Sequence, residues 1–471
     1  MSMKAVIATV VLAILLGGLL VIVNQRGGSG TAAAAPVLEF DPGAVAALRI
    51  TPPDRAETVV QRTAEGGWTM PVGPTEWPLN PSGPQELIRR LSSLTPIVDP
   101  GARTPTAVAE PARPVTVAIA LRDGSTRSVR VSTQPAAGIV AAQVDSGTPF
   151  LAEAALLNSI TTPGPRGWRV TSALPGVGPA DLASLTVTSG TSTIAFERTG
   201  NVWQVSRPVS TRADQRAVAE LIQRLGRSSI ERFIDEPTPA EKAGSGLDRP
   251  RMVITAERQS RADDTLRMGR PANRIRELFI GGPAGGASAG AYAAPDRSGA
   301  VLFVIPGDLP TSISTTIRTY LATTATDTSP ADVAVVSISR TGASESGYRR
   351  QMGQWTSLAD AQQANGAAVE GLLSFLATQP GEPDAVLPGR PEGLRSLARI
   401  SLIDLDGESR DMLIAGYTAD GVFAVRSGNL VLMYPGQRPP EILGIPAFAD
   451  LPPADPNAPR PVTGKPAESV K

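Results

Sequence analysis

Three stretches of this chain repeat one order of features, and this repetition restricts the fold more than any single motif does. Each stretch has two short segments of alternating polarity, then a tryptophan, and after a polar gap an amphipathic segment. From Trp68 to Leu87, Trp203 to Leu221 and Trp355 to Leu372 the separations are 19, 18 and 17 residues. The period of about 140–150 residues is far longer than a solenoid repeat, so we expect tandem domains.

The amphipathic segments predict one helix in each copy. Their apolar residues are largely spaced i, i+3, i+4 and i+7, which places them on one helical face. The three sets are Leu87, Ile88, Leu91 and Leu94; Val218, Leu221, Ile222 and Leu225; and Val369, Leu372, Leu373 and Leu376. In the first copy, Ser82 and Gln85 are placed as a capping box for the helix start.

A second set of strands is expected after each helix. Hairpin turns are predicted at Asp123-Gly124 and Asp406-Gly407, and a strand of the second copy at residues 266–269. Further hairpin-like segments are at residues 139–144, 291–294 and 422–426. The predicted fold class is therefore α+β: three tandem repeats, each an antiparallel sheet with one or two packed helices, after an amino-terminal transmembrane helix.

Residues 5–23 contain no charged side chain. As a helix they span roughly 28 Å, close to the ~30 Å hydrocarbon core of a bilayer, which predicts a single membrane anchor. The rival interpretation is a cleaved signal peptide, whose apolar region is normally about 7–15 residues. Lys4 precedes the segment and Arg26 follows it, so the charge bias is slight, and we expect the amino terminus inside.

The expected domain organisation follows from these segments. After the anchor at residues 5–23 comes a flexible linker at residues 24–36. The three α+β repeats cover residues 37–161, 175–323 and 330–449. The Pro-rich residues 452–471 have few large apolar groups to offset their ordering entropy, so a disordered tail is expected there.

Two missing residue types exclude much chemistry. The 471-residue chain has no Cys, which removes disulfides, thiolate nucleophiles and Cys-type zinc sites, and no His, which removes the commonest general base and metal ligand. Its 44 basic and 44 acidic residues balance, and no cluster of basic residues stands out. Nucleic-acid binding is therefore not expected.

Several motifs suggest chemistry, and each has a simpler structural interpretation. Residues 286–290 match the G-x-S-x-G elbow through Ser288, but no His partner exists, so a flexible loop is expected. Residues 404–408 resemble the start of a calcium loop, but position twelve would be Ala415, so a hairpin turn is favoured. The acidic pairs Asp263-Asp264 and Asp235-Glu236 are interpreted as solvated loop charges. We predict no catalytic, cofactor-binding or metal-binding residue.

The three tryptophans leave two possibilities open. Trp68, Trp203 and Trp355 are suited to stacking on glycans if they are exposed. The favoured interpretation is that each fills the space between a hairpin and its helix. Exposure of the rings distinguishes the two.

The second copy resembles the bacterial domain-of-unknown-function family 4340. The resemblance lies in residues 180–235 and 246–313, and is looser in the other two copies. It rests on Glu197-Arg198 before Trp203, on Pro208 and Ala213-Asp214 before the helix, and on Gly246-Leu247-Asp248-Arg249-Pro250. The resemblance implies an anchored envelope protein whose relatives are associated with transport systems linked to gliding motility, and it supplies no catalytic residues.

The expected function is a non-enzymatic scaffold or accessory subunit of a cell-envelope complex. The chain would sit in the inner membrane through residues 5–23, with the remaining body outside the cytoplasm. Its expected partners are envelope proteins, transporter subunits among them. The alternative is a module that binds cell-wall or surface glycans. A carboxylate-based hydrolase would need two facing acids in a cleft, and no such pair is indicated.

Overall fold

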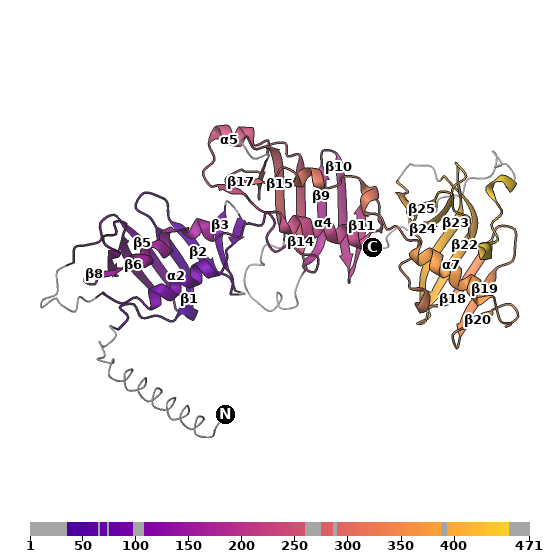
Figure 1. The fold of residues 1–471 in the computed structure, drawn as a ribbon, viewed down its shortest axis with the longest axis horizontal. Coiled ribbons are helices and arrows are strands. Elements are labelled where there is room, and N and C mark those ends of the chain that lie inside the picture. Colours follow the sequence, from indigo (N-terminus) through magenta and orange to yellow (C-terminus); the bar gives the residue numbers. More distant parts are fainter. Residues whose placement is uncertain are drawn as a thin grey trace, which may run out of the picture. The chain divides into compact units, whose positions relative to one another are not determined.

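The protein is built mainly from antiparallel β-sheets with a few helices (Figure 1). The computed structural model describes residues 35–64, 66–72, 75–97, 108–259, 275–285, 290–387 and 393–451. The chain divides into two compact units, one ending at Val170 and one beginning at Thr171. Three sheets lie in these units, which confirms the predicted α+β class.

The first unit contains one sheet of eight strands. Their order is β4-β3-β2-β1-β5-β6-β7-β8. The strands are β1 (Val45–Thr51), β2 (Thr58–Arg62), β3 (Trp68–Val72), β4 (Thr75–Pro78), β5 (Pro114–Leu121), β6 (Thr126–Ser132), β7 (Ile139–Val144) and β8 (Phe150–Glu153). Its helical elements are η1 (Pro42–Ala44), α2 (Ser82–Ser92), α3 (Ala154–Thr161) and η2 (Pro165–Trp168).

The second unit begins with a sheet of nine strands. The order is β12-β11-β10-β9-β14-β15-β16-β17-β13. The strands are β9 (Leu182–Ser189), β10 (Ser192–Thr199), β11 (Val202–Arg207), β12 (Thr211–Arg212), β13 (Arg232–Ile234), β14 (Met252–Arg258), β15 (Ile275–Pro283), β16 (Ala291–Ala294) and β17 (Leu302–Ile305). Helical elements here are α4 (Gln215–Arg227), α5 (Pro239–Gly244), α6 (Leu309–Ser312) and η4 (Ile317–Tyr320).

The third sheet has eight strands in the order β20-β19-β18-β22-β23-β24-β25-β21. The strands are β18 (Val333–Arg340), β19 (Ser346–Gln351), β20 (Gln354–Ser357), β21 (Glu382–Ala385), β22 (Leu394–Asp404), β23 (Ser409–Thr418), β24 (Phe423–Ser427) and β25 (Leu430–Tyr434). The helical elements are η5 (Pro330–Asp332), α7 (Gly366–Thr378), η6 (Glu441–Leu443) and η7 (Phe448–Asp450).

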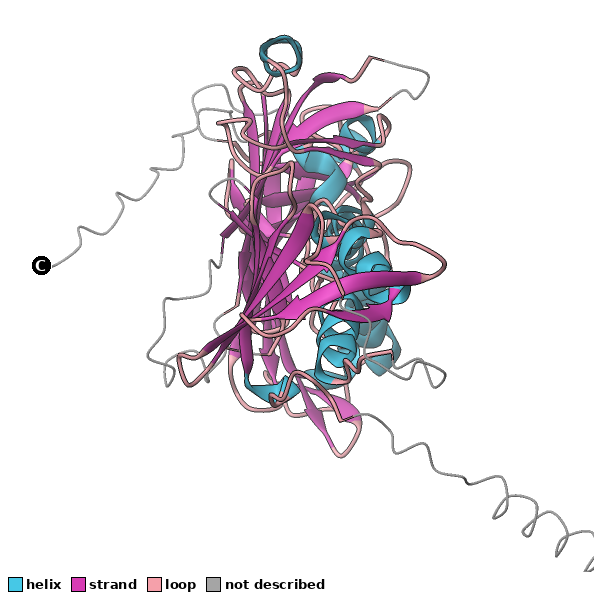
Figure 2. Ribbon diagram, turned by 90° about the vertical axis from the view of Figure 1, so that its left-hand side faces the viewer, coloured by secondary structure: helices cyan, strands magenta, loops and turns pink. Residues whose placement is uncertain are grey.

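The centre of all three sheets has one strand order. In each, the first strand pairs with the second on one side and with the first long strand after the helix on the other: β1 with β5, β9 with β14, and β18 with β22. The chain therefore forms half a sheet, crosses one face as a helix, and returns to complete the sheet from its centre. The longer helices lie against one face of the strands (Figure 2).

The helices are where the apolar spacing predicts them. Eight apolar residues of these helices are fully buried: Leu87, Leu91, Val218, Ile222, Leu225, Val369, Leu372 and Leu376. Along the strands, buried residues alternate with half-buried ones, and in β5 the buried ones are Val115, Val117 and Ile119. Burying each such side chain stabilises the fold by about 1.5–3 kcal/mol.

One local prediction fails, and one strand was not predicted. The capping box at Ser82 and Gln85 is wrong, because the helix α2 already includes Ser82, and Pro81 stands at its N-cap without a side-chain bond. Asn80 instead accepts from the amide and hydroxyl of Ser82, at 3.2 and 2.8 Å. The strand β15 was not predicted, and the strand expected at residues 266–269 lies outside the described residues.

Helices long and apolar enough to cross a membrane are not found within the described ranges. The predicted anchor at residues 5–23 and the tail at 452–471 lie outside those ranges, as does nearly all of the linker at 24–36. The predicted boundaries of three separate domains stay a prediction.

Candidate functional site

The three repeated tryptophans lie at one topological position. Trp68, Trp203 and Trp355 are on β3, β11 and β20, on the hairpin that precedes the helix. Their exposed fractions are 3%, 4% and 2%. The chain's other two tryptophans, Trp77 and Trp168, are also buried. The interpretation of the tryptophans as core residues is therefore confirmed, and no indole face is open to a glycan.

An arginine lies directly across the hairpin from each of these tryptophans. The register pairs Arg62 with Trp68, Arg198 with Trp203, and Arg350 with Trp355. The guanidinium carbon is 5.7 Å from the ring centroid in the first pair and 4.7 Å in the third. Such stacking adds about 0.5–2 kcal/mol to the packing of the ring.

Each of these arginines also holds the start of its own sheet. Arg62 donates to the Gly43 carbonyl at 2.9 Å, just before β1. Arg198 donates to the carbonyls of Pro179 and Ala180 before β9, and Arg350 to those of Pro330 and Ala331 before β18. The repeated Arg–Trp pair thus ties the hairpin, the core and the entry to the sheet together.

The motif residues that carry the family resemblance have similar structural roles. The Asp214 carboxylate caps α4 by accepting from the Ala217 amide at 3.0 Å. Gly246 has φ +68°, and an added Cβ would lie 3.1 Å from the Gly282 nitrogen, so glycine is needed there. The Leu247 side chain is buried in a small cluster with Phe279 and Val304.

Polar side chains also gather where the chain passes from the second sheet to the third. The junction segment, residues 321–329, contains several buried residues: Leu321, Ala325 and Thr326 are at most 1% exposed. Its backbone pairs on both sides. The Ala322 amide donates to the Arg212 carbonyl on β12, and the Ala325 amide donates to Leu376 near the end of α7.

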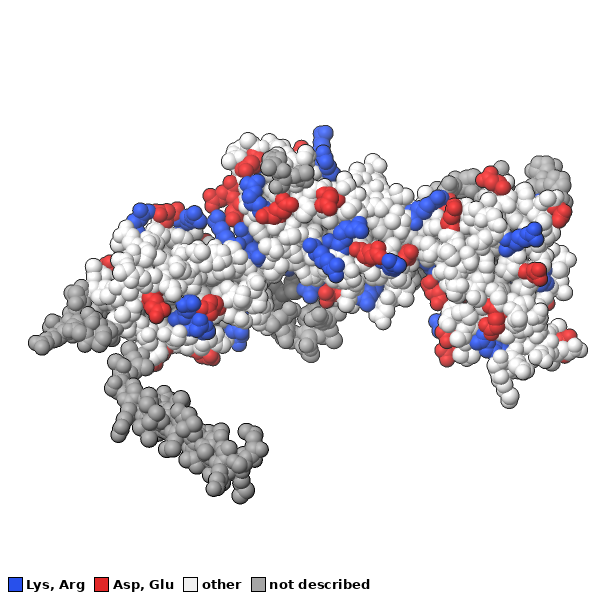
Figure 3. All heavy atoms as spheres, in the orientation of Figure 1, with Lys and Arg blue, Asp and Glu red and all other residues white. Residues whose placement is uncertain are grey.

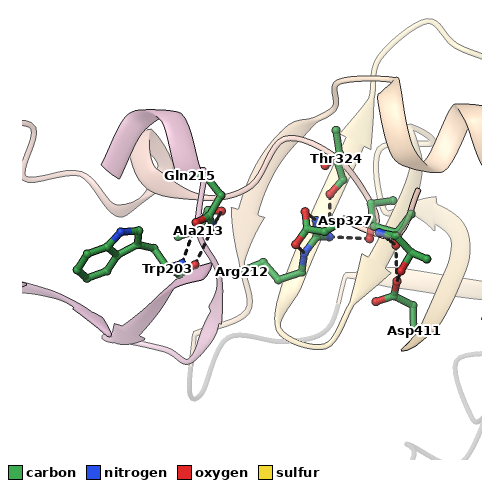
Figure 4. Close-up of polar contacts among 10 residues, drawn as sticks. Trp203, Arg212, Ala213, Gln215, Thr324, Asp327 and Asp411 are labelled. Carbon is green, nitrogen blue, oxygen red and sulfur yellow. Dashed lines mark hydrogen bonds and ion pairs between the residues drawn. The ribbon is translucent and has the colours of Figure 1, made fainter. Parts of the chain in front are cut away.

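Arg212 is the central side chain of this junction (Figure 4). It donates to the carbonyls of Thr324 and Ala325 at 2.9 and 2.7 Å, and it forms a two-point ion pair with Asp327. Its side chain is only 19% exposed. Burial raises the pKa of the Tyr434 hydroxyl well above its ordinary value, and the positive charge of Arg212 opposes that rise.

The other half of the junction is held by Asp411 of β23. Its carboxylate accepts from the hydroxyls of Thr326 and Thr328. In the second sheet, the side-chain amide of Gln215 bonds to the backbone of Trp203 at two points. Its Oε1 accepts from the Trp203 backbone amide at 2.8 Å, and its Nε2 donates to the Trp203 carbonyl at 2.8 Å. A chain of polar contacts therefore leads from the hairpin tryptophan through β12 and the junction segment to β23 (Figure 4).

A cleft of about 770 Å³ opens beside the junction. Five aspartates line it, against Arg212 and Arg410. The five are Asp327, Asp332, Asp404, Asp406 and Asp411. Their carboxylates do not form a metal-binding group within the part of the chain that the structure describes. Two of these acids form ion pairs: Asp327 with Arg212, and Asp404 with Arg410.

Asp404 shows how these acids are used. It begins the predicted Asp-Gly turn, which joins β22 to β23 with Gly407 at φ +86°. Burial alone would raise the pKa of Asp404, but bonds from the Glu408 amide and the Arg410 guanidinium outweigh burial and hold that pKa below its usual value. The predicted hairpin turn is confirmed, and Ala415 lies buried within β23.

The remaining candidates are not brought together. Asp235 and Glu236 follow β13, half-buried and exposed respectively. Residues 286–289, including Ser288, and the pair Asp263-Asp264 lie outside the described residues. Arg212, Asp327 and Asp411, which form the junction, were missed by the sequence analysis. These residues are more than 80 positions apart, so no local sequence pattern predicts that they meet. The one hint is that Arg212 directly precedes the Ala213-Asp214 motif.

These features define an α+β protein of repeated antiparallel sheets whose polar clusters connect segments of its own chain. Residues 203–379 match the sequence model of a family described as Domain of unknown function (DUF4340). The match shows the predicted resemblance, but it runs from Trp203 on β11 to the end of α7 and so extends into the third sheet. No curated protein and no solved structure matches the chain.

Proposed function

We propose that this protein is a non-enzymatic, membrane-anchored scaffold or accessory subunit of a cell-envelope complex, with the bulk of the chain, residues 30–471, outside the cytoplasm. The observation that carries the proposal is the use of its polar side chains. The repeated Arg–Trp pairs, the Arg212 junction and the Asp404 turn all bond to the protein's own backbone. A framework of this kind holds surfaces in place for partners.

The distribution of charge on the surface supports the proposal that the partners are proteins. On the face seen in Figure 3, acidic and basic side chains are interspersed over the described residues. A mixed surface does not attract one class of polyion, whereas it suits specific contacts with other proteins. Large apolar side chains that stand exposed among these charges, such as Leu405 at 65% and Met412 at 56%, are suited to the centre of such contacts.

The proposed membrane anchor and envelope location are inferred from residues 5–23. Their uncharged length is suited to one membrane crossing, and the resemblance to the family points to transporter subunits of the envelope as partners. The alternative function, glycan binding, has less support, because all five tryptophans are buried and cannot stack on a sugar ring. The scaffold role is therefore the better supported of the two.

Co-purification tests this proposal directly. The full-length protein would be extracted from its native membrane in a mild detergent, and the proteins that accompany it would be identified by mass spectrometry. A stoichiometric membrane partner is the expected result. The matched control is a variant with Leu405→Ser and Met412→Ser, which should keep the fold and lose the partner if these side chains lie in the interface. Recovery of the protein alone, together with binding to purified cell-wall glycan, would contradict the scaffold role.

A further inference from the structure

One end of the first sheet contains a cavity that the proposed scaffold role does not use. It lies between the β1–β2 loop, the start of β5 and the segment that follows α3, and it has a volume of about 580 Å³. That size is typical of sites for small ligands. The buried side chains of Ile50, Val115 and Ile160 form part of its lining. We call it the basic pocket.

At the corresponding place in the other two sheets, a side chain bonds to a neighbouring segment. Seven residues separate Ile50 from its partner Thr58 in the first sheet, and seven separate Ile338 from its partner Ser346 in the third. Pro52 therefore corresponds to Arg340. The Arg340 guanidinium donates to the carbonyls of Ile442 and Leu443, at 2.7 and 2.8 Å.

In the second sheet, a hydroxyl makes the bond at this end. The Oγ of Ser192 donates to the Thr315 carbonyl at 3.3 Å. In the first sheet, the side chain of Pro52 has no donor and cannot reach across in this way. The first unit thus lacks the side-chain bond that the other two sheets make at this place.

Arginine side chains give the pocket its charge. Arg55, Arg113 and Arg166 line it together with a single acid, Asp54, so its net charge is about +2. The hydroxyl-bearing side chains of Thr58 and Thr133 are also part of the lining. Guanidinium groups and hydroxyls are the donors that proteins use to bind phosphate oxygens.

Arg113 is held in an unfavourable backbone conformation at this site. Its φ is +43°, in the left-handed region that favours glycine. Hydroxyl bonds fix this turn: Ser132 donates to the Ala112 carbonyl and Thr133 to the Arg113 carbonyl, at 3.2 and 3.0 Å. The conformation directs the guanidinium to Asp54, with bonds of 2.7 and 2.6 Å. Strain that neighbouring groups maintain in this way is typical of binding sites.

We propose that the basic pocket binds a phosphate group, carried either by a soluble molecule or by a lipid headgroup. Arg55 and Arg113 contact the phosphate oxygens, and Asp54 holds Arg113 in position until the anion replaces it. The proposal does not depend on the scaffold role, since a scaffold needs no ligand here.

The test uses the full-length protein in an uncharged detergent and isothermal titration calorimetry at low salt. Inorganic phosphate is the probe for the soluble source, and dihexanoylphosphatidylglycerol is the probe for the headgroup. We expect Arg55→Ala and Arg113→Asn each to weaken binding at least about tenfold, because each removes a charge-assisted contact. Asparagine is chosen at position 113 because it tolerates positive φ. Asp54→Asn should tighten binding, because it removes the competing carboxylate.

The control is Arg122→Ala, which removes an exposed arginine of the same unit outside the pocket and should leave affinity unchanged. Binding of phosphate alone assigns a soluble ligand, and binding of the lipid assigns a headgroup. The proposal is overturned if neither probe binds to protein with an unchanged melting curve. It is equally overturned if Arg55→Ala and Arg113→Asn bind as tightly as the parent, or if Arg122→Ala weakens binding as much as they do.

Discussion

At the scale of single residues, the stability of each hairpin depends on one buried indole ring. Trp203→Ala removes a large, buried ring on β11 and leaves a cavity in its place. We expect a loss of about 3–5 kcal/mol in the free energy of unfolding of the second unit, measured by urea denaturation. Val202→Ala changes the neighbouring, 45% exposed side chain and should have a small effect. Equal curves for Trp203→Ala and the parent would show that the ring is not part of the core.

Asp404 gives the third sheet a defined response to acid. Its pKa is lowered in the folded protein, so its bonds stabilise the fold above the unfolded pKa of about 3.9. This stabilisation is lost as the pH falls through the lower, folded pKa. Melting temperatures measured between about pH 6 and 2 should therefore fall less steeply for Asp404→Asn than for the parent. Parallel curves would contradict this role, and Asp406→Asn, which leaves the Arg410 bond intact, is the control.

The sequence analysis identified the tryptophans but not the roles of their partners. A lone aromatic residue at a repeated spacing indicates a core position, since few other side chains are large enough to fill it. Arg198 was part of the quoted motif, but its bonds to Pro179 and Ala180 join residues 18 or more positions apart. The spacing of apolar residues does not predict hydrogen bonds between distant positions. The Arg–Trp pairs are therefore seen only in the structure.

At the scale of elements, the junction segment is held chiefly by Arg212 of β12. Arg212→Ala leaves the Thr324 and Ala325 carbonyls without their donor and Asp327 without its ion-pair partner. We expect a loss of about 1–3 kcal/mol in stability. The segment should open locally, so chymotrypsin should cut after the buried Tyr320 faster than in the parent.

The control for this prediction is Arg216→Ala on the adjacent helix. Arg216 is 88% exposed and forms its ion pair with Glu220 one turn away, so its loss should change proteolysis little. Equal cleavage rates for Arg212→Ala and Arg216→Ala would mean that Arg212 does not hold the junction.

Helices and hairpins were predictable because their signals are local. The apolar spacing of Val218, Leu221 and Ile222 shows the helix without knowledge of its partner, and Asp-Gly dipeptides show the tight turns. The start of α2 was mispredicted because Asn80 and Pro81, just upstream, set it in place of Ser82. The strand β15 ends in Gly281-Gly282-Pro283, residues that are rare in strands, and this hid it.

At the scale of the whole molecule, the repetition in the sequence corresponds to a repetition of topology. The three sheets share a central run of seven strands, from β3 to β8, from β11 to β17 and from β20 to β25, because each copy repeats the same local succession of hairpin, helix and meander. They differ at the edges: β13 and β21 add a last strand to the second and third sheets. The grouping of these sheets was not predictable. The first sheet belongs to a separate unit, whereas the second and third lie in one, joined by the buried junction segment. Within the second unit, Arg212 and Asp411 bond to the segment that joins the two sheets, and the sequence pattern contains no signal for either residue.

The grouping predicts how the protein unfolds. Calorimetry of the full-length protein should show two transitions, one for the unit ending at Val170 and one for the unit beginning at Thr171. Leu87→Ala, in the core of α2, should lower only one transition, with a loss of about 2–5 kcal/mol. Leu372→Ala, the matching change in α7, should lower only the other, and Trp203→Ala should lower the same transition as Leu372→Ala. If Leu372→Ala and Trp203→Ala instead act on different transitions, the second and third sheets unfold independently, and the junction does not couple them.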